Sequence, residues 1–171
     1  QQRLTTCIIF ITSFIEFLQK HLDKTPDDCI NSQRIKDIIE HYLYIKKPDS
    51  TITAFKFGYE NKNPNFEYLK DNIIRHTVNP NKKENYYTGK LDIAKEYFSK
   101  NIKEYYEKHD NNEECLAKLF KKIVSQLKFN LYELDNDFDI FVTFETMNNR
   151  GKPRTTLELL KNRLIYLVEL S

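Results

Sequence analysis

The stretch LTTCIIFITSFIEFLQKHL, residues 4–22, decides the fold of this chain because it carries a strong helical pattern. Its apolar residues recur at spacings of three and four, the pattern of an amphipathic helix with one buried face. The residues of that predicted face are Leu4, Ile8, Ile11, Ile15, Leu18 and Leu22. The apolar run from Cys7 to Ile11 is far shorter than the roughly 18 residues that a membrane-spanning helix needs.

The same periodicity predicts four further helices before residue 128. Ser32 is expected to cap the second helix, which Pro48 ends. A short extended stretch is expected at 55–59, where aromatic residues alternate with Lys56 and Gly58, and the composition of 78–89 predicts a loop. The apolar faces of the four helices lie within residues 35–43, 66–74, 91–106 and 116–127.

After Lys128 the spacing of the apolar residues changes from the helical pattern to the pattern of β-strands. Residues 129–134 and 138–144 are predicted strands, joined by a turn at 135–137. Thr155 and Glu158 form the capping box of a last helix. The fold class is therefore α+β and predominantly helical. The chain begins without methionine and directly at a helix, and a sheet of two or three short strands is marginal alone, so we expect preceding strands to complete it.

The composition restricts the class of protein. The chain has 171 residues, of which 40% are hydrophobic and 30% charged, as in globular domains. Its net charge of +2 permits a nucleic-acid partner but does not require one. Cys7, Cys29 and Cys115 are isolated, which predicts unpaired, reduced thiols in a cytoplasmic protein. No signal-peptide pattern is found at the N-terminus.

Two segments place basic and amide side chains just before a predicted helix. They are Gln1-Gln2-Arg3 and the segment from Asn148 to Lys152. A helix N-terminus has free backbone N–H groups and a positive dipole end, and both attract anions. Arginine adds a planar fork that matches phosphate, and Gly151 allows close backbone approach. The alternative is that Arg3 is an ordinary surface residue and that the second segment is only a turn.

These two segments resemble motifs of one family. Gln1-Gln2-Arg3-Leu4-Thr5-Thr6 resembles the end of the Asp-Gly-Gln-Gln-Arg-Leu-Thr-Thr motif in the N-terminal domains of GmrSD restriction endonucleases. Residues 144–162 resemble the second signature of that family, Phe-Glu-x-x-Asn-x-x-Gly-Lys followed by an apolar pair and Leu-Lys-Asn. Residues 57–64 and 127–132 resemble segments of its helical insert. Position 154 is Arg where Leu is more usual, and the Asp and Gly of the first motif are not in the chain.

The resemblance implies a fold similar to ParB and sulfiredoxin within a single domain. Residues 1–29 and 129–171 would supply core elements, and 30–128 would form a helical insert. It also implies an NTP-hydrolysis site, with Mg²⁺ accompanying the NTP in the full-length protein. The nucleotide-binding residues would be Gln1, Gln2, Arg3, Arg150, Gly151 and Lys152, and the catalytic residues Glu145 and Asn148.

In that family the NTP site regulates a nuclease domain that attacks modified or foreign DNA. The implied partners are thus an NTP, DNA, and a nuclease domain or subunit outside this chain. The chain alone is expected to bind NTP weakly, because the front of its first motif is missing. Arg3 and Arg150 are expected to meet at one cleft, beside the end of the 138–144 strand.

Two other functions remain open from the sequence. The chain could be a non-catalytic helical interaction module, or a DNA-binding sensor of modified bases. Basic residues near the last helix could face phosphates of either NTP or DNA; they are Arg150, Lys152, Arg154, Lys161 and Arg163. The four histidines are expected on the surface, and the aspartates at 135–139 are expected in a solvated turn, because they lack the Gly and distal Glu of a calcium loop.

Overall fold

The computed structural model describes residues 2–46, 53–58, 63–75 and 85–128, together with four helical positions, Thr156, Leu157, Leu160 and Leu164. Residues 1–127 and 128–171 form two compact units. The described part is mainly helical, with two short antiparallel strand pairs, so the predicted fold class is confirmed. The predicted strands at 129–134 and 138–144 lie outside the described residues.

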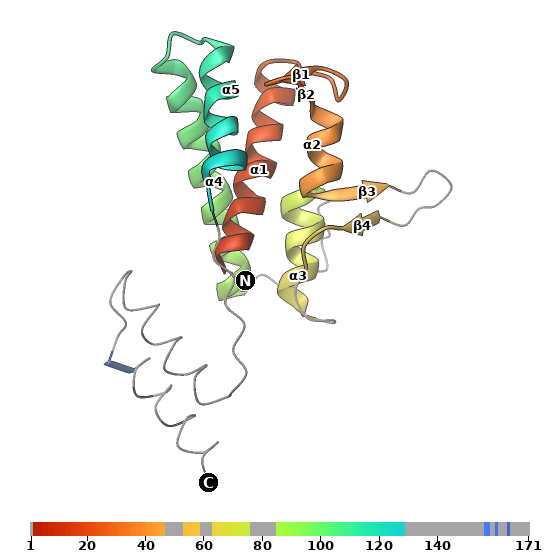
Figure 1. Ribbon diagram of the computed structural model, residues 1–171. Helices are drawn as coiled ribbons and strands as arrows, with labels where there is room; N and C mark the ends of the chain where they lie inside the picture. Colours follow the sequence, from red (N-terminus) through yellow and green to blue (C-terminus); the bar gives the residue numbers. More distant parts are fainter. Residues whose placement is uncertain are drawn as a thin grey trace. The chain divides into compact units, whose positions relative to one another are not determined.

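Helix α1 (Gln2–His21) is the centre of the first unit (Figure 1). Every residue from Ile8 to Ile15 is buried, as are Phe17 and Leu18. A helix that is apolar on all sides belongs in the interior of a protein. The prediction of a helix was right, but the prediction of a single buried stripe was wrong. Phenylalanines and Ile9 fill the faces between the stripe residues, while Leu4 is 45% exposed.

Helix α4 (Tyr86–Glu107) runs parallel to α1 and packs along its length. Phe10 meets Phe98 edge-on, with ring centroids 5.5 Å apart, and Phe17 meets Tyr106 in the same way, also at 5.5 Å. The residue that comes later in α1 contacts the residue that comes later in α4, so the two helices are parallel. Edge-to-face contacts are favourable for aromatic rings, and these two fix the position of α4 along the axis of α1.

Helix α5 (Glu113–Lys121) returns alongside α1 and ends in the short π-helix η2 (Lys122–Gln126). Phe120 is fully buried and stacks on Phe14, with centroids 5.4 Å apart. The turn between α4 and α5 contains Asp110 and Asn111, both with positive φ. Asn112 then caps α5 by accepting a hydrogen bond from the N–H of Glu114 at 2.9 Å. The polar residues at 109–112 thus separate α4 from α5.

Helix α2 (Ile35–Tyr42) covers another side of α1. It is preceded by strands β1 (Cys29–Ile30) and β2 (Gln33–Arg34), and followed by β3 (Tyr44–Lys46) and β4 (Thr53–Phe55). β1 pairs antiparallel with β2, and β3 antiparallel with β4, with Ile45 opposite Ala54.

The prediction that Ser32 caps α2 was wrong. Ser32 and Asn31 have φ of 63° and 47° and form the two-residue turn between β1 and β2, while Arg34 stands at the N-cap without a side-chain cap. Two successive positive φ values are what a tight hairpin turn requires. A cap and a turn both favour serine, so the residue type alone does not separate them.

Helix α3 (Pro64–Tyr68) continues into the short π-helix η1 (Leu69–Ile74). Pro64 starts this helix rather than belonging to the preceding turn, and Asn63 is its cap. The predicted loop at 78–89 was partly wrong, because α4 already begins at Tyr86. Asn85 and Thr88 form a reciprocal capping box there, which the turn-like composition concealed.

The cysteines are unpaired, as predicted. Cys7 lies inside α1, Cys29 is exposed in β1, and Cys115 is buried in the first turn of α5. Among the described helices, none combines the length and apolar character needed to cross a membrane.

The aromatic packing around α1 should dominate stability. Phe14→Ala is expected to lower the free energy of unfolding by about 3–5 kcal/mol, because Phe14 is fully buried and its loss leaves a cavity. Urea denaturation followed by circular dichroism measures this change. Tyr87→Ala, at a residue that is 66% exposed, is the control and should change stability by no more than about 0.5 kcal/mol.

Substitution of Ser32 distinguishes its role in the β1–β2 turn from a role as the cap of α2, because the two roles predict changes in stability of opposite sign. Ser32→Gly should raise the free energy of unfolding by about 1 kcal/mol, because glycine adopts a φ of 63° without the steric cost of a Cβ. If Ser32 capped α2, the same change would lower stability by a few tenths of a kcal/mol. Urea denaturation at equilibrium decides between the two.

Candidate functional site

The structure describes only part of the predicted nucleotide site. Arg3 is described with its side chain, and Gln2 only as the first residue of α1. The other predicted residues lie outside the described part of the chain; they are Gln1, Glu145, Asn148, Arg150, Gly151 and Lys152. The meeting of Arg3 and Arg150 at one cleft therefore stays a prediction.

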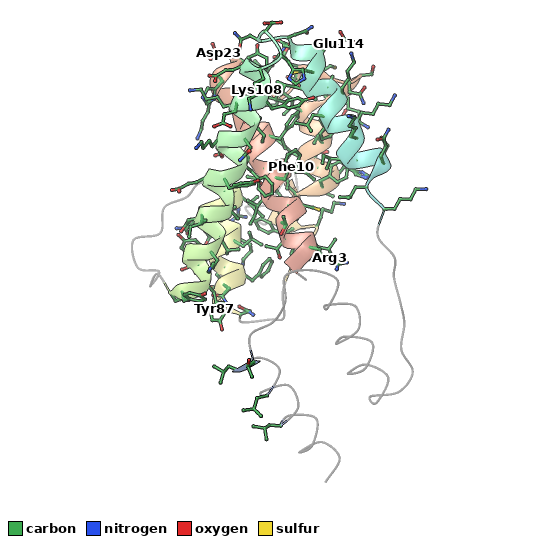
Figure 2. All side chains as sticks on the ribbon, turned by 90° about the vertical axis from the view of Figure 1, so that its left-hand side faces the viewer. Arg3, Phe10, Asp23, Tyr87, Lys108 and Glu114 are labelled. Atoms are coloured by element: carbon green, nitrogen blue, oxygen red, sulfur yellow. The ribbon has the colours of Figure 1, made fainter. Side chains whose placement is uncertain are left out.

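Arg3 lies in the first turn of α1 and is exposed (Figure 2). The first turn carries no acidic side chain, and Arg3 has no ion-pair partner among the residues that the structure describes. The N-terminal turn of a helix also presents backbone N–H groups and the positive end of the dipole. The geometry at this end of α1 is therefore suited to an anion.

The starts of three helices lie at the end of the unit where Arg3 is found (Figure 1). α1 and α4 are parallel, as described above. The α3–η1 segment is parallel to α4, since the Tyr68 hydroxyl lies 2.6 Å from Asp92 Oδ2 and Lys95 Nζ lies 3.3 Å from the Ile73 carbonyl oxygen. Three helix dipoles thus point their positive ends the same way.

At two of these three helix N-termini, a side chain of the chain itself caps the backbone N–H groups. The Asn63 side chain accepts from the N–H of Asn65 at 3.0 Å, and the Asn85 side chain accepts from the N–H groups of Tyr87 and Thr88 at 2.9 and 3.0 Å. These capped amides are already satisfied and do not offer the same anion site. The start of α1, which carries Arg3, is the best remaining candidate.

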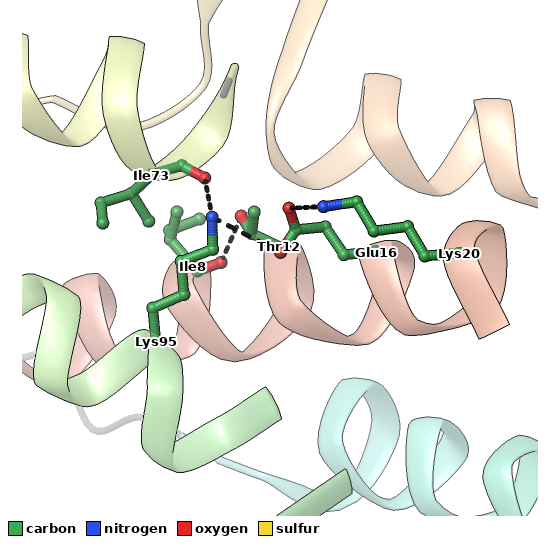
Figure 3. Close-up of polar contacts among 6 residues, drawn as sticks. All are labelled: Ile8, Thr12, Glu16, Lys20, Ile73 and Lys95. Atoms are coloured by element: carbon green, nitrogen blue, oxygen red, sulfur yellow. Dashed lines mark hydrogen bonds and ion pairs between the residues drawn. The ribbon is translucent and has the colours of Figure 1, made fainter. Parts of the chain in front are cut away.

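A half-buried polar cluster joins α1, η1 and α4 (Figure 3). Lys95 Nζ donates to the Ile73 carbonyl at 3.3 Å and lies 3.4 Å from Glu16 Oε2. Glu16 Oε1 also accepts from Lys20 Nζ at 3.3 Å. The side chains of Lys95 and Glu16 are only 19% and 13% exposed. Burial lowers the pKa of Lys95, and the neighbouring Glu16 carboxylate partly opposes that shift.

The chemistry of this cluster is structural. Ile73 lies in the last turn of η1, and the carbonyls of a final helical turn have no partner within the helix. Lys95 satisfies one of them and pairs with a carboxylate on α1, so one ammonium ties three elements together. Sequence reasoning missed this cluster, because its members come from distant segments and form no motif.

The described histidines lie where the sequence placed them, on the surface. His21, His41 and His109 are exposed, as predicted, and His76 lies outside the described residues. Across the described ranges, no group of three or more His, Cys, Asp or Glu side chains could hold a metal ion.

Comparison with known proteins gave one match. The family model described as "GmrSD restriction endonuclease, N-terminal domain" matches residues 1–165. No curated protein and no solved structure matches the chain.

The buried position of Lys95 predicts a pH dependence of stability. Its pKa in the folded state lies below the unfolded value of 10.5, so the unfolded chain binds more protons as the pH approaches 10.5. The stability of the wild type relative to Lys95→Met should therefore rise with pH in that window. Chemical denaturation of both proteins over a pH series measures the difference.

Lys118→Met is the matched control, because the hydrogen bond that Lys118 donates to the Glu114 carboxylate raises the pKa of Lys118 above 10.5. The wild type should lose stability relative to this variant as the pH rises above 10.5, which is the opposite sign. A pH trend of the same sign in both comparisons would contradict the assignment of the shift to the burial of Lys95.

Proposed function

Because the chain belongs to the GmrSD restriction endonuclease N-terminal domain family, we propose that it is the NTP-binding and NTP-hydrolysing regulatory domain of a modification-dependent DNA restriction enzyme. The nuclease domain or subunit that cuts DNA lies outside this chain. The enzyme acts in the cytoplasm against foreign DNA. The observation that carries the proposal is the exposed Arg3 at the start of α1, within the Gln-Gln-Arg motif of the family.

The physical support comes from the first turn of α1. A triphosphate needs several converging donors, and this turn supplies a guanidinium together with backbone N–H groups and a helix dipole. The burial of α1 from Ile8 to Ile15 makes it a rigid base for these donors. A fixed helix keeps its backbone donors in position, so only the exposed Arg3 side chain loses conformational freedom at binding.

The second motif completes the site in this proposal. Arg150, Gly151 and Lys152 add donors for the phosphates, and Asn148 closes the pocket over the nucleotide. Glu145 orients the attacking water or the Mg²⁺ that accompanies the NTP, since a carboxylate oxygen is the kind of ligand that Mg²⁺ prefers. The bound Mg²⁺ would neutralise phosphate charge.

The test is nucleotide binding by the full-length protein, measured by isothermal titration calorimetry. Arg3→Ala should weaken the affinity for NTP by about 1.5–3 kcal/mol, the usual value of a charged hydrogen bond, which is roughly 10- to 160-fold. The control is Arg34→Ala, which removes another exposed arginine that pairs with Asp37 at 3.0 Å. Its affinity should match that of the wild type.

Equal affinities of Arg3→Ala and wild type would remove Arg3 from the site. Absence of any NTP binding by the full-length protein would favour the helical interaction module. A steep decrease of DNA affinity with salt, without nucleotide binding, would favour the sensor of modified bases, because phosphate contacts release counterions.

A further inference from the structure

Helix α4 carries an exposed stripe on the side that faces away from α1. Its members follow one helical face at spacings of four, three, four and three, and we name them the α4 stripe: Tyr86, Lys90, Ile93, Tyr97 and Lys100. Tyr86, Ile93 and Tyr97 are 74%, 62% and 61% exposed. Three large apolar side chains aligned on one surface helix are more than the scattered exposed residues of an ordinary surface.

The α4 stripe is complementary to the α4 stripe of a second copy when the two helices lie antiparallel. If a second copy of α4 lies antiparallel with Ile93 on the two-fold axis, Ile93 meets its own equivalent. Lys100 then faces Tyr86 of the second copy, and Lys90 lies within one residue, about 1.5 Å along the helix axis, of the level of Tyr97 of the second copy. Each of the last two contacts occurs twice, as a two-fold interface requires. Neither lysine of the stripe faces a lysine.

The chemistry of these pairs is already present within one chain. Lys90 Nζ lies 5.0 Å from the centroid of the Tyr86 ring, a cation–π contact. Gly89, next to the stripe, has nothing within 4 Å of the position that a Cβ would occupy. The surface beside Ile93 is therefore low and open, so a tyrosine ring of a second helix can approach the backbone closely.

We propose that the α4 stripe is a self-association surface, which binds the α4 stripe of a second copy of this chain in antiparallel orientation. The flanking charges favour this occupant over a nucleic acid. Glu96 is exposed beside the stripe, and Lys100 lies 3.8 Å from Glu104, so carboxylates border the lysines. Carboxylates repel phosphates, whereas in the paired helices they remain at the solvated rim.

The size of the contact sets its strength. The overlap from residue 86 to residue 100 spans about 21 Å at a rise of about 1.5 Å per residue. One such helix pair buries less than the roughly 1,600 Å² of a standard stable interface. Self-association through the stripe is therefore weak and depends on protein concentration. It is independent of the proposed nucleotide function.

The sharpest test is disulfide trapping, because only residues near the two-fold axis can be bridged to their own equivalents. Ile93→Cys should cross-link two copies under mild oxidation, in a Cys29→Ser background that removes the exposed native thiol. Tyr86→Cys is the matched control. Its equivalents lie about 21 Å apart along the helices, far beyond the roughly 4–7 Å between the Cα atoms of a disulfide.

Sedimentation velocity over a concentration series provides the second readout. The wild type should show a dimer that increases with concentration, and Ile93→Glu should raise the dissociation constant by at least about tenfold. Ile93 is 62% exposed, so this change should leave the fold intact, which circular dichroism checks. The proposal is wrong if the wild type stays monomeric, if Ile93→Glu still dimerises normally, or if both cysteine variants cross-link equally. It is also wrong if Ile93→Glu weakens DNA binding without changing association.

Discussion

The burial of α1 on all its sides is the constraint on which the first unit depends. Its phenylalanines point outward in different directions, and each finds an aromatic or aliphatic partner on another helix. Phe10 and Phe17 set the position of α4, and Phe14 sets that of α5 through Phe120. α2 and η1 cover the remaining sides. Because a close-packed interior has few alternative arrangements, one central helix determines where its neighbours lie.

A helix that is buried all round must pair most of its polar side chains, and among the described residues of α1 the buried Ser13 hydroxyl is left without a hydrogen-bond partner. The Thr12 hydroxyl donates a hydrogen bond to the Ile8 carbonyl oxygen at 2.9 Å, so it needs no partner outside the helix. Glu16 lies near the boundary of the core, where Lys20 and Lys95 neutralise it. Since unpaired charges are costly in a low-dielectric interior, these pairings are a condition of packing α1 between η1 and α4. They also hold α1, η1 and α4 together.

The same rigidity connects the fold to the proposed function. Thr5, two residues after the exposed Arg3, is already buried, and the continuously buried part of α1 begins at Ile8. A ligand at the start of α1 would thus contact a helix that packs against α2, η1, α4 and α5. Nucleotide-dependent regulation needs such coupling, because a ligand shifts a conformational equilibrium only through contacts that differ between states. In the function proposed above, the target of this coupling is the nuclease domain.

The helical segments, the predominantly helical class and the family could all be predicted from the sequence, because periodicity and short motifs are local properties. The sequence identified α1 as a helix and Arg3 as a residue at its start. It did not predict the burial of α1 on all sides, the turn at Ser32 or the pairing of Lys95 with Glu16. Serine serves caps and turns equally, and a charge pair between distant segments exists only after the helices have packed. The exposure of aromatic side chains also depends on tertiary packing. The aromatic residues of α1 are buried against other helices, whereas Tyr86 and Tyr97 of α4 face solvent. The physical reason is that burial depends on which elements surround a side chain, and local sequence carries no record of those neighbours.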